Sequence, residues 1–139
     1  FLGLDSGVAN MSESYFKKEY VNILQPLIMS DTGYYTQHLN KRCLPTLYKM
    51  GWVGLGVDST VDIRHTFKKY KDGFIQGNFD EKLLLLPHKE CRHHIEEFLN
   101  TMQTVDTTGW ICGLGHGIHK TTPEENVQMF VRMVRERFE

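Results

Sequence analysis

Short apolar segments alternate with amphipathic segments along most of the 139-residue chain. The apolar segments have the length of strands, and the amphipathic ones repeat apolar residues at helical spacing. The predicted strands are Phe1–Asp5, Tyr34–His38, Trp52–Asp58, Phe74–Asn78 and Trp110–Leu114. They are apolar on both faces, as buried parallel strands are, and strand–helix alternation implies right-handed crossovers. The pattern therefore predicts an α/β fold, either an open doubly wound sheet or a portion of a (β/α)8 TIM barrel.

The predicted helices differ in how clearly the sequence marks their ends. The first begins after Ser12, which is suited to the N-cap, and Pro26 kinks or ends it. The middle helices are predicted at Cys43–Met50, Val61–Lys71 and His88–Met102. The last helix has the strongest signal, because Thr122, Pro123 and Glu125 supply an N-cap, a first-turn proline and a capping box. Its predicted buried stripe consists of Val127, Phe130, Val131, Val134 and Phe138.

Composition narrows the possible partners and surroundings of the chain. A 40% apolar content is typical of a globular protein, and the length predicts one domain over residues 1–139. A formal net charge of −1 gives no electrostatic basis for binding nucleic acid or an anionic membrane surface. No apolar run approaches the ~18 residues of a membrane span. Three cysteines without a CxxC pair favour a reducing compartment, so a cytoplasmic protein is expected, with an organelle as the alternative.

Polar or small residues follow each predicted strand. The clusters are Asp5–Gly7, Gln37–Asn40, Gly56–Thr60, Gln76–Asp80 and Gly115–Gly117. In parallel α/β folds, ligands bind beyond the carboxyl ends of the strands, where these clusters would meet. The pattern favours a ligand site at this rim over ordinary turn and cap chemistry.

His116 stands between two glycines where the last predicted strand ends. An imidazole titrates near neutral pH, so it can hold a carboxylate or move a proton. General acid, carboxylate anchor and capped turn residue all remain open for His116 on spacing alone. The surrounding Gly-Leu-Gly-His-Gly lacks the GxGxxG spacing and the lysine–hydroxyl pair of phosphate loops, so it is a weak phosphate signal.

Two other sets of residues could carry out chemistry or could have only a structural role. His88, Cys91 and His94 contain metal-ligating atoms, but their spacing spreads them around a helix, which favours a solvated helix face over a zinc site. Ser6 could pair with a distant histidine, yet no G-x-S-x-G elbow surrounds it, so a serine nucleophile is disfavoured.

Several segments together resemble a known family. They are "LDSGVANMSESYF" from Leu4, "MGWVGLGVDSTVD" from Met50, "FIQGNFD" from Phe74 and "GWICGLGHGIHKTTPEENVQMFVRMVRE" from Gly109. In this order they are similar to the C-terminal part of the uroporphyrinogen decarboxylase family. The last two segments are the specific ones, and the others support them.

The resemblance implies a (β/α)8 barrel that removes four acetate carboxyl groups from uroporphyrinogen, giving coproporphyrinogen without a metal or organic cofactor. By motif, His116 and Ser6 match the family's active-site histidine and serine at the substrate mouth. The substrate-binding positions implied are Gln76, Asn78, Asp80, Gly115 and Gly117, of which the first three have a shaping role. A porphyrinogen is the implied partner.

The chain departs from the family pattern at Gly113, Ser59 and Glu81, where the family has Asn, Trp and Pro. The family's central aspartate, substrate-binding arginines and active-site tyrosine belong to a part that precedes these segments. The domain is therefore expected to be incomplete at its N-terminal side. Either the chain is a portion of a longer protein or a second chain completes it, and a homodimer is one expected form.

Two alternative functions stay open. A corrinoid-linked methyltransferase of the same barrel superfamily would hold zinc with a His-x-Cys pair and a distant cysteine. Here the corresponding residues are His38-Leu39-Asn40, and His116 stands in place of the late cysteine. The second alternative is a non-catalytic homologue that serves as a subunit.

Overall fold

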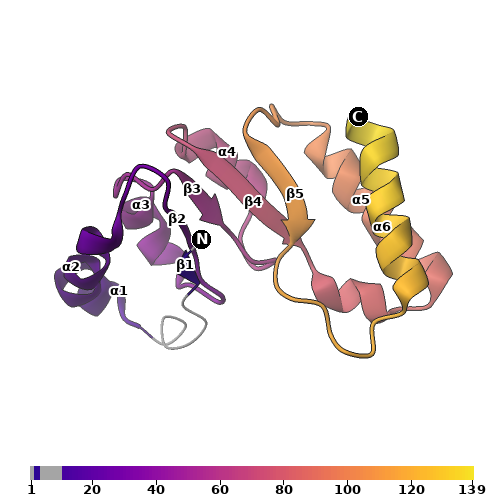
Figure 1. The fold of residues 1–139 in the computed structure, drawn as a ribbon, viewed down its shortest axis with the longest axis horizontal. Helices are drawn as coiled ribbons and strands as arrows, with labels where there is room; N and C mark the ends of the chain where they lie inside the picture. Colours follow the sequence, from indigo (N-terminus) through magenta and orange to yellow (C-terminus); the bar gives the residue numbers. More distant parts are fainter. Residues whose placement is uncertain (1, 4–10) are drawn as a thin grey trace.

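The computed structural model describes residues 2–3 and 11–139, which form a five-stranded parallel sheet flanked by helices (Figure 1). The strands are β1 (Leu2–Gly3), β2 (Gly33–Tyr35), β3 (Gly54–Gly56), β4 (Phe74–Phe79) and β5 (Trp110–Leu114). Each strand pairs in parallel with the next one along the chain, so the order in the sheet is β1-β2-β3-β4-β5.

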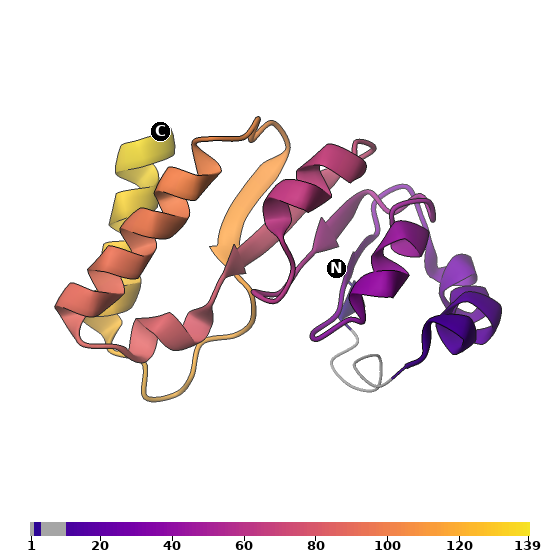
Figure 2. The ribbon, with the colours of Figure 1, turned by 180° about the vertical axis from the view of Figure 1, so that it is seen from behind.

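This sequential order decides between the two predicted architectures. A doubly wound sheet reverses its strand order at a switch point, whereas a (β/α)8 barrel adds each strand beside the preceding one. The described strands never reverse. Helices α3 (Leu44–Leu47), α4 (Ile63–Lys69) and α5 (His88–Met102) lie on one face of the sheet, which faces the viewer in Figure 2. The α/β prediction is confirmed, and the winding is that of a (β/α)8 barrel.

The two long helices of the described chain, α5 and α6 (Glu124–Phe138), both follow β4. The part of the chain before β4 holds α1 (Glu13–Tyr15), the π-helix η1 (Phe16–Tyr20), α2 (Val21–Leu24), η2 (Gln25–Leu27), η3 (Lys41–Cys43), α3 (Leu44–Leu47) and α4 (Ile63–Lys69). The second part holds η4 (Glu81–Leu85), α5 (His88–Met102) and α6 (Glu124–Phe138). Ser12 caps the first helical segment by accepting from the Tyr15 N–H at 3.2 Å, and Pro26 lies in its closing 3-10 turn, as predicted.

Some boundaries differ from the sequence prediction, and the causes are local. Strand β5 and helix α5 occupy the predicted residues, but β2 ends at Tyr35 rather than His38. His38 has a φ of 55°, in the left-handed region that cannot continue a strand. The predicted Thr122 cap is wrong, because Pro123 occupies the N-cap position and the Thr122 hydroxyl has no hydrogen bond among the described residues.

Two apolar clusters hold the helices against the sheet. The first packs β2 and β3 against the early helices around Phe16, Tyr34 and Trp52. The second packs β4 against α5 and α6, with the Phe79 ring 5.4 Å from that of Phe98 and 5.1 Å from that of Phe130. Close packing of this kind fixes the direction in which each strand points.

The buried face of α6 is rotated from the predicted stripe. Met129, Phe130 and Met133 are the buried apolar residues of this helix, while Val131 and Phe138 are exposed. The prediction is confirmed for Phe130, which is buried, and for Val127 and Val134, which pack against the second cluster. It is wrong for Val131 and Phe138, because the methionines fill the space between α5 and the sheet, and methionine adapts to irregular gaps. Within residues 2–3 and 11–139, no helix combines the length and apolar character that crossing a bilayer requires.

The three cysteines are free thiols, and each lies against apolar neighbours. Cys43 and Cys91 are fully buried, and the half-buried Cys112 packs beside the second cluster. Burial raises the pKa of all three thiols, that of Cys112 from 9.0 to about 12. Because a raised thiol pKa favours the neutral form, the stability contributed by Cys112 is present below pH 9.0 and is lost between 9.0 and about 12.

We predict that these thiols react slowly with iodoacetamide at neutral pH in the folded protein, because the thiolate is the nucleophile and burial suppresses it. Peptide mass spectrometry after timed alkylation measures each cysteine separately. The denatured protein is the control, in which Cys43, Cys91 and Cys112 should all be modified rapidly. Modification of folded Cys112 at the rate of a free cysteine would contradict the prediction.

Candidate active site

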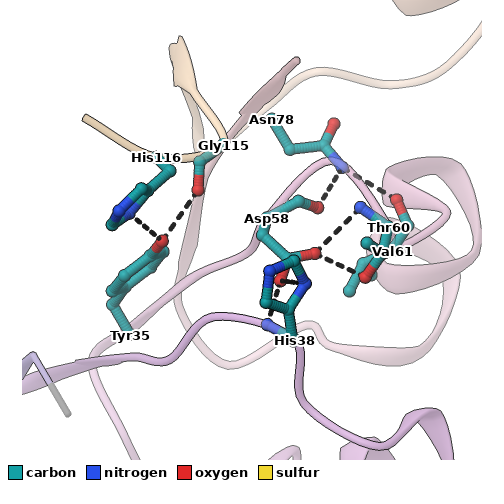
Figure 3. Close-up of polar contacts among 8 residues, drawn as sticks. All are labelled: Tyr35, His38, Asp58, Thr60, Val61, Asn78, Gly115 and His116. Atoms are coloured by element: carbon teal, nitrogen blue, oxygen red, sulfur yellow. Dashed lines mark hydrogen bonds and ion pairs between the residues drawn. The ribbon is translucent and has the colours of Figure 1, made fainter. Parts of the chain in front are cut away.

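The carboxyl ends of β2 and β5 meet through Tyr35 and His116 (Figure 3). The Tyr35 hydroxyl donates to the Gly115 carbonyl at 2.8 Å and lies 3.0 Å from His116 Nδ1. The two rings are nearly parallel, with an interplanar angle of 8° and centroids 6.4 Å apart. His116 is half-buried, so part of its ring is accessible at the rim. The structure therefore places the predicted histidine at the mouth side of the sheet.

Gly115 must be glycine because two strand ends approach closely there. A Cβ at this position would lie 2.6 Å from the Ser59 backbone nitrogen, closer than real Cβ contacts come. The Gly115 N–H donates to the Phe79 carbonyl at 2.7 Å, which extends the β4–β5 pairing beyond β5. Gly115 is thus held by Phe79 on one side and by the Ser59 backbone on the other. These contacts fix the position of the backbone at His116, the next residue.

Asp58 organises the loops after β2 and β3. The residue is 3% exposed. Its Oδ1 accepts from the Thr60 N–H at 2.8 Å and from the Thr60 hydroxyl at 2.5 Å, and its Oδ2 accepts from the His38 N–H. The His38 Nδ1 lies 3.8 Å from Oδ2. A buried carboxylate requires such donors to offset its loss of hydration, so Asp58 keeps two neighbouring loops in one arrangement.

Asn78, near the carboxyl end of β4, connects this strand to the same centre. Its side-chain nitrogen donates to the carbonyls of Asp58 and Val61, both at 2.8 Å, and the residue is buried (Figure 3). Because both amide hydrogens reach backbone carbonyls, they shape the β3 loop. The shaping role in substrate binding that the family resemblance implies for Asn78 stays a prediction.

The remaining predicted residues are dispersed around this rim. Gln76 is half-buried on β4, with its Cγ 3.8 Å from where a Cβ of Gly113 would lie. Asp80 caps η4, its Oδ1 accepting from the Lys82 N–H at 3.0 Å, and it lines a cavity bordered by α4 and α5. Gly117 is exposed with no atom within 4 Å of a Cβ placed on it. Ser6 lies outside the described residues.

Sequence reasoning missed Tyr35 and the organising role of Asp58. Tyr35 follows the buried Tyr34 at a strand end, so alternation places it on the opposite face of the sheet. That signal is present in the sequence. The meeting of Tyr35 with His116, 81 residues away, depends on strand order, which the sequence left open between two architectures.

On α5, Cys91, His88 and His94 each contact other side chains of the protein. Cys91 is fully buried in the second cluster, and His88 Nδ1 lies 2.9 Å from Asn126 Oδ1. His94 Nδ1 lies 3.3 Å from Glu97 Oε2 on the same helix. Across the part of the chain that the structure describes, no three histidine, cysteine, aspartate or glutamate side chains converge in a set that could hold a metal ion.

The fold and rim define the class of protein: a segment of a (β/α)8 barrel with a histidine at the carboxyl end of its last described strand. A structural comparison agrees on the fold. A methyltransferase from Methanosarcina mazei matches with a TM-score of 0.74 at 21% identity, covering 99% of this chain and 42% of that protein. At this identity the likeness shows the fold alone.

Sequence comparison places the chain more narrowly. The family model described as uroporphyrinogen decarboxylase (URO-D) matches residues 16–137. The uroporphyrinogen decarboxylase of Hydrogenobaculum is 38% identical over 87 residues, which are 63% of this chain and 24% of that protein. That of Chlamydia muridarum is 40% identical over 88 residues, 63% of this chain and 26% of that protein. The chain belongs to the uroporphyrinogen decarboxylase family, and the matched segment spans about a quarter of the length of these relatives.

We predict that alanine lowers the stability of the protein at one of the two glycines beside His116 and leaves it unchanged at the other. Gly115→Ala should destabilise the protein by about 1–3 kcal/mol, because the added methyl group overpacks against the Ser59 backbone. Gly117→Ala should leave stability unchanged, since its Cβ would face open space. Denaturant unfolding of the two variants and the parent measures the difference, and equal stabilities for the two variants would refute the packing explanation.

Proposed function

We propose that this chain supplies one wall of the substrate mouth of a uroporphyrinogen decarboxylase, with His116 facing the tetrapyrrole. The single observation that carries the proposal is the position of His116. It lies at the carboxyl end of β5, oriented by Tyr35 and partly accessible, on a backbone that Gly115 fixes. The relatives named uroporphyrinogen decarboxylases supply the reaction class.

The chemistry of the substrate fits a rim of this kind. Uroporphyrinogen carries eight carboxylates, so a site for it needs hydrogen-bond donors around a concave opening. His116 can supply one such donor once its ring has taken up a proton, and the exposed Gly117 leaves its backbone accessible to a large ligand. Asp58 and Asn78 act indirectly, because they hold the loops that form this side of the opening.

Each decarboxylation exchanges one carboxylate for one proton. Protonation of a pyrrole carbon produces a cation; the bond to the carboxyl carbon then breaks, and its electron pair neutralises that cation as carbon dioxide leaves. The exocyclic methylene that results takes up a proton to become a methyl group, and the ring carbon loses the proton that it gained in the first step. A fixed negative charge stabilises the cation. The family resemblance assigns that charge to an aspartate outside this chain, so His116 is proposed to bind substrate and transfer protons here. No metal or organic cofactor enters this scheme.

We predict that His116→Ala in the full-length protein slows loss of acetate carboxyl groups roughly 10²-fold or more, the usual effect of losing a positioned acid–base group. Chromatography of the partly decarboxylated porphyrins, after oxidation, measures each step. The matched control is His119→Ala on the same loop, whose exposed ring contacts Thr121 at 2.8 Å. That control should retain activity.

Unchanged turnover in the His116 variant would remove this residue from the mechanism. Complete absence of turnover and of porphyrin binding in the intact parent protein would instead support the non-catalytic subunit. Thermal unfolding of both variants separates a chemical effect from a folding defect.

The methyltransferase alternative is favoured by one observation, the fold shared with the Methanosarcina mazei protein. His38 provides an exposed imidazole at the rim, but Leu39 and Asn40 follow it where a zinc thiolate would be needed. Cys112 packs among apolar side chains of the second cluster. These surroundings favour the decarboxylase.

We predict that the purified full-length protein, dialysed against a weak chelator, contains less than one zinc per chain by elemental analysis. A tight stoichiometric zinc that is lost in a His38→Ala variant would support the methyltransferase instead. His65→Ala, at an exposed position on α4, serves as the control for adventitious binding through surface histidines.

A further inference from the structure

The hydrogen bonds of Tyr35 determine which nitrogen of His116 carries a proton. A phenol has one hydrogen to donate, and a backbone carbonyl can only accept. At 2.8 Å from the Gly115 carbonyl, the Tyr35 hydroxyl must direct its hydrogen there. The contact of 3.0 Å to His116 Nδ1 then requires Nδ1 to donate to the phenol oxygen.

The opposite arrangement has a physical cost. If the phenol donated to Nδ1, two oxygens would face each other at 2.8 Å without a hydrogen between them. Gly115 cannot withdraw easily, because its N–H bonds the Phe79 carbonyl and its α-carbon lies against Ser59. Tyr35 is confined as well, since its ring lies over Gly56, where a Cβ would be 2.8 Å from Tyr35 Cδ2.

We propose that Tyr35 is a positioning residue that fixes neutral His116 as the Nδ1–H tautomer and leaves the Nε2 lone pair for the ligand. A neutral imidazole has one N–H, so an Nδ1–H leaves Nε2 as an acceptor. The tautomer follows from these two hydrogen bonds, while its use on a tetrapyrrole rests on the proposed function.

This tautomer sets the order of events at the rim. Neutral His116 can accept a hydrogen bond from a ring N–H of the substrate, or take a proton, but its Nε2 repels a carboxylate. Once Nε2 has accepted a proton, the ring donates from both nitrogens, and the Nδ1–H bond to Tyr35 is unchanged. His116 therefore becomes a carboxylate donor only after it has taken up the proton that it can later deliver.

Nitrogen NMR of the full-length protein labelled with ¹⁵N-histidine tests the tautomer directly. The spectra are recorded above the ordinary histidine pKa of about 6.5, and His116→Gln assigns the signals. The expected His116 pattern is a protonated Nδ1 and an unprotonated Nε2. Tyr35→Phe, which keeps the ring and removes the hydroxyl, should shift the pattern toward Nε2–H. Tyr34→Phe is the matched control, because the adjacent Tyr34 packs against Trp52 with ring centroids 5.2 Å apart.

Two results would overturn the proposal. One is an Nε2–H tautomer in the parent protein. This measurement does not depend on whether any variant folds. The other is a folded Tyr35→Phe variant with lowered turnover and an unchanged His116 pattern. The NMR measurement requires no turnover, so loss of the decarboxylase assignment would leave the tautomer standing, and the reverse also holds.

Discussion

A buried carboxylate stands at the centre of the arrangement that forms the rim. Asp58 is removed from water, so the donors of His38 and Thr60 must converge on it. Asn78 bonds the Asp58 carbonyl, and Gly115 lies against the Asp58–Ser59 backbone. Residues at the ends of four neighbouring strands therefore all contact Asp58 or its backbone. The position of His116 depends on these contacts.

Much of this fold could be predicted from the sequence, where a local rule sufficed. Strand β5 and helix α5 were predicted at their observed residues because apolar periodicity was strong. The shorter β2 could not be predicted, since it ends at Tyr35, before the chain turns at His38 to meet a carboxylate 20 residues away. The face of α6 was misjudged for a similar reason, because Met129 and Met133 pack according to the shape of the neighbouring elements.

The candidate site shows the same division. Polar strand ends and a histidine between glycines indicated a rim and its principal side chain. Which residue would orient that histidine required the order of the strands, and so Tyr35 was missed. The departures from the family pattern lie in different surroundings. Gly113 has ordinary spacing to Gln76 and Ser59 is exposed, whereas Glu81 is buried in the first turn of η4.

The burial of all three native thiols makes this rim accessible to chemical labelling. Because Cys43, Cys91 and Cys112 are held neutral, a cysteine introduced at the open Gly117 position would be the most reactive thiol of the chain. A fluorophore attached there would stand beside His116. Its emission would report the entry of a ligand at this rim, independently of whether any carboxyl group is removed.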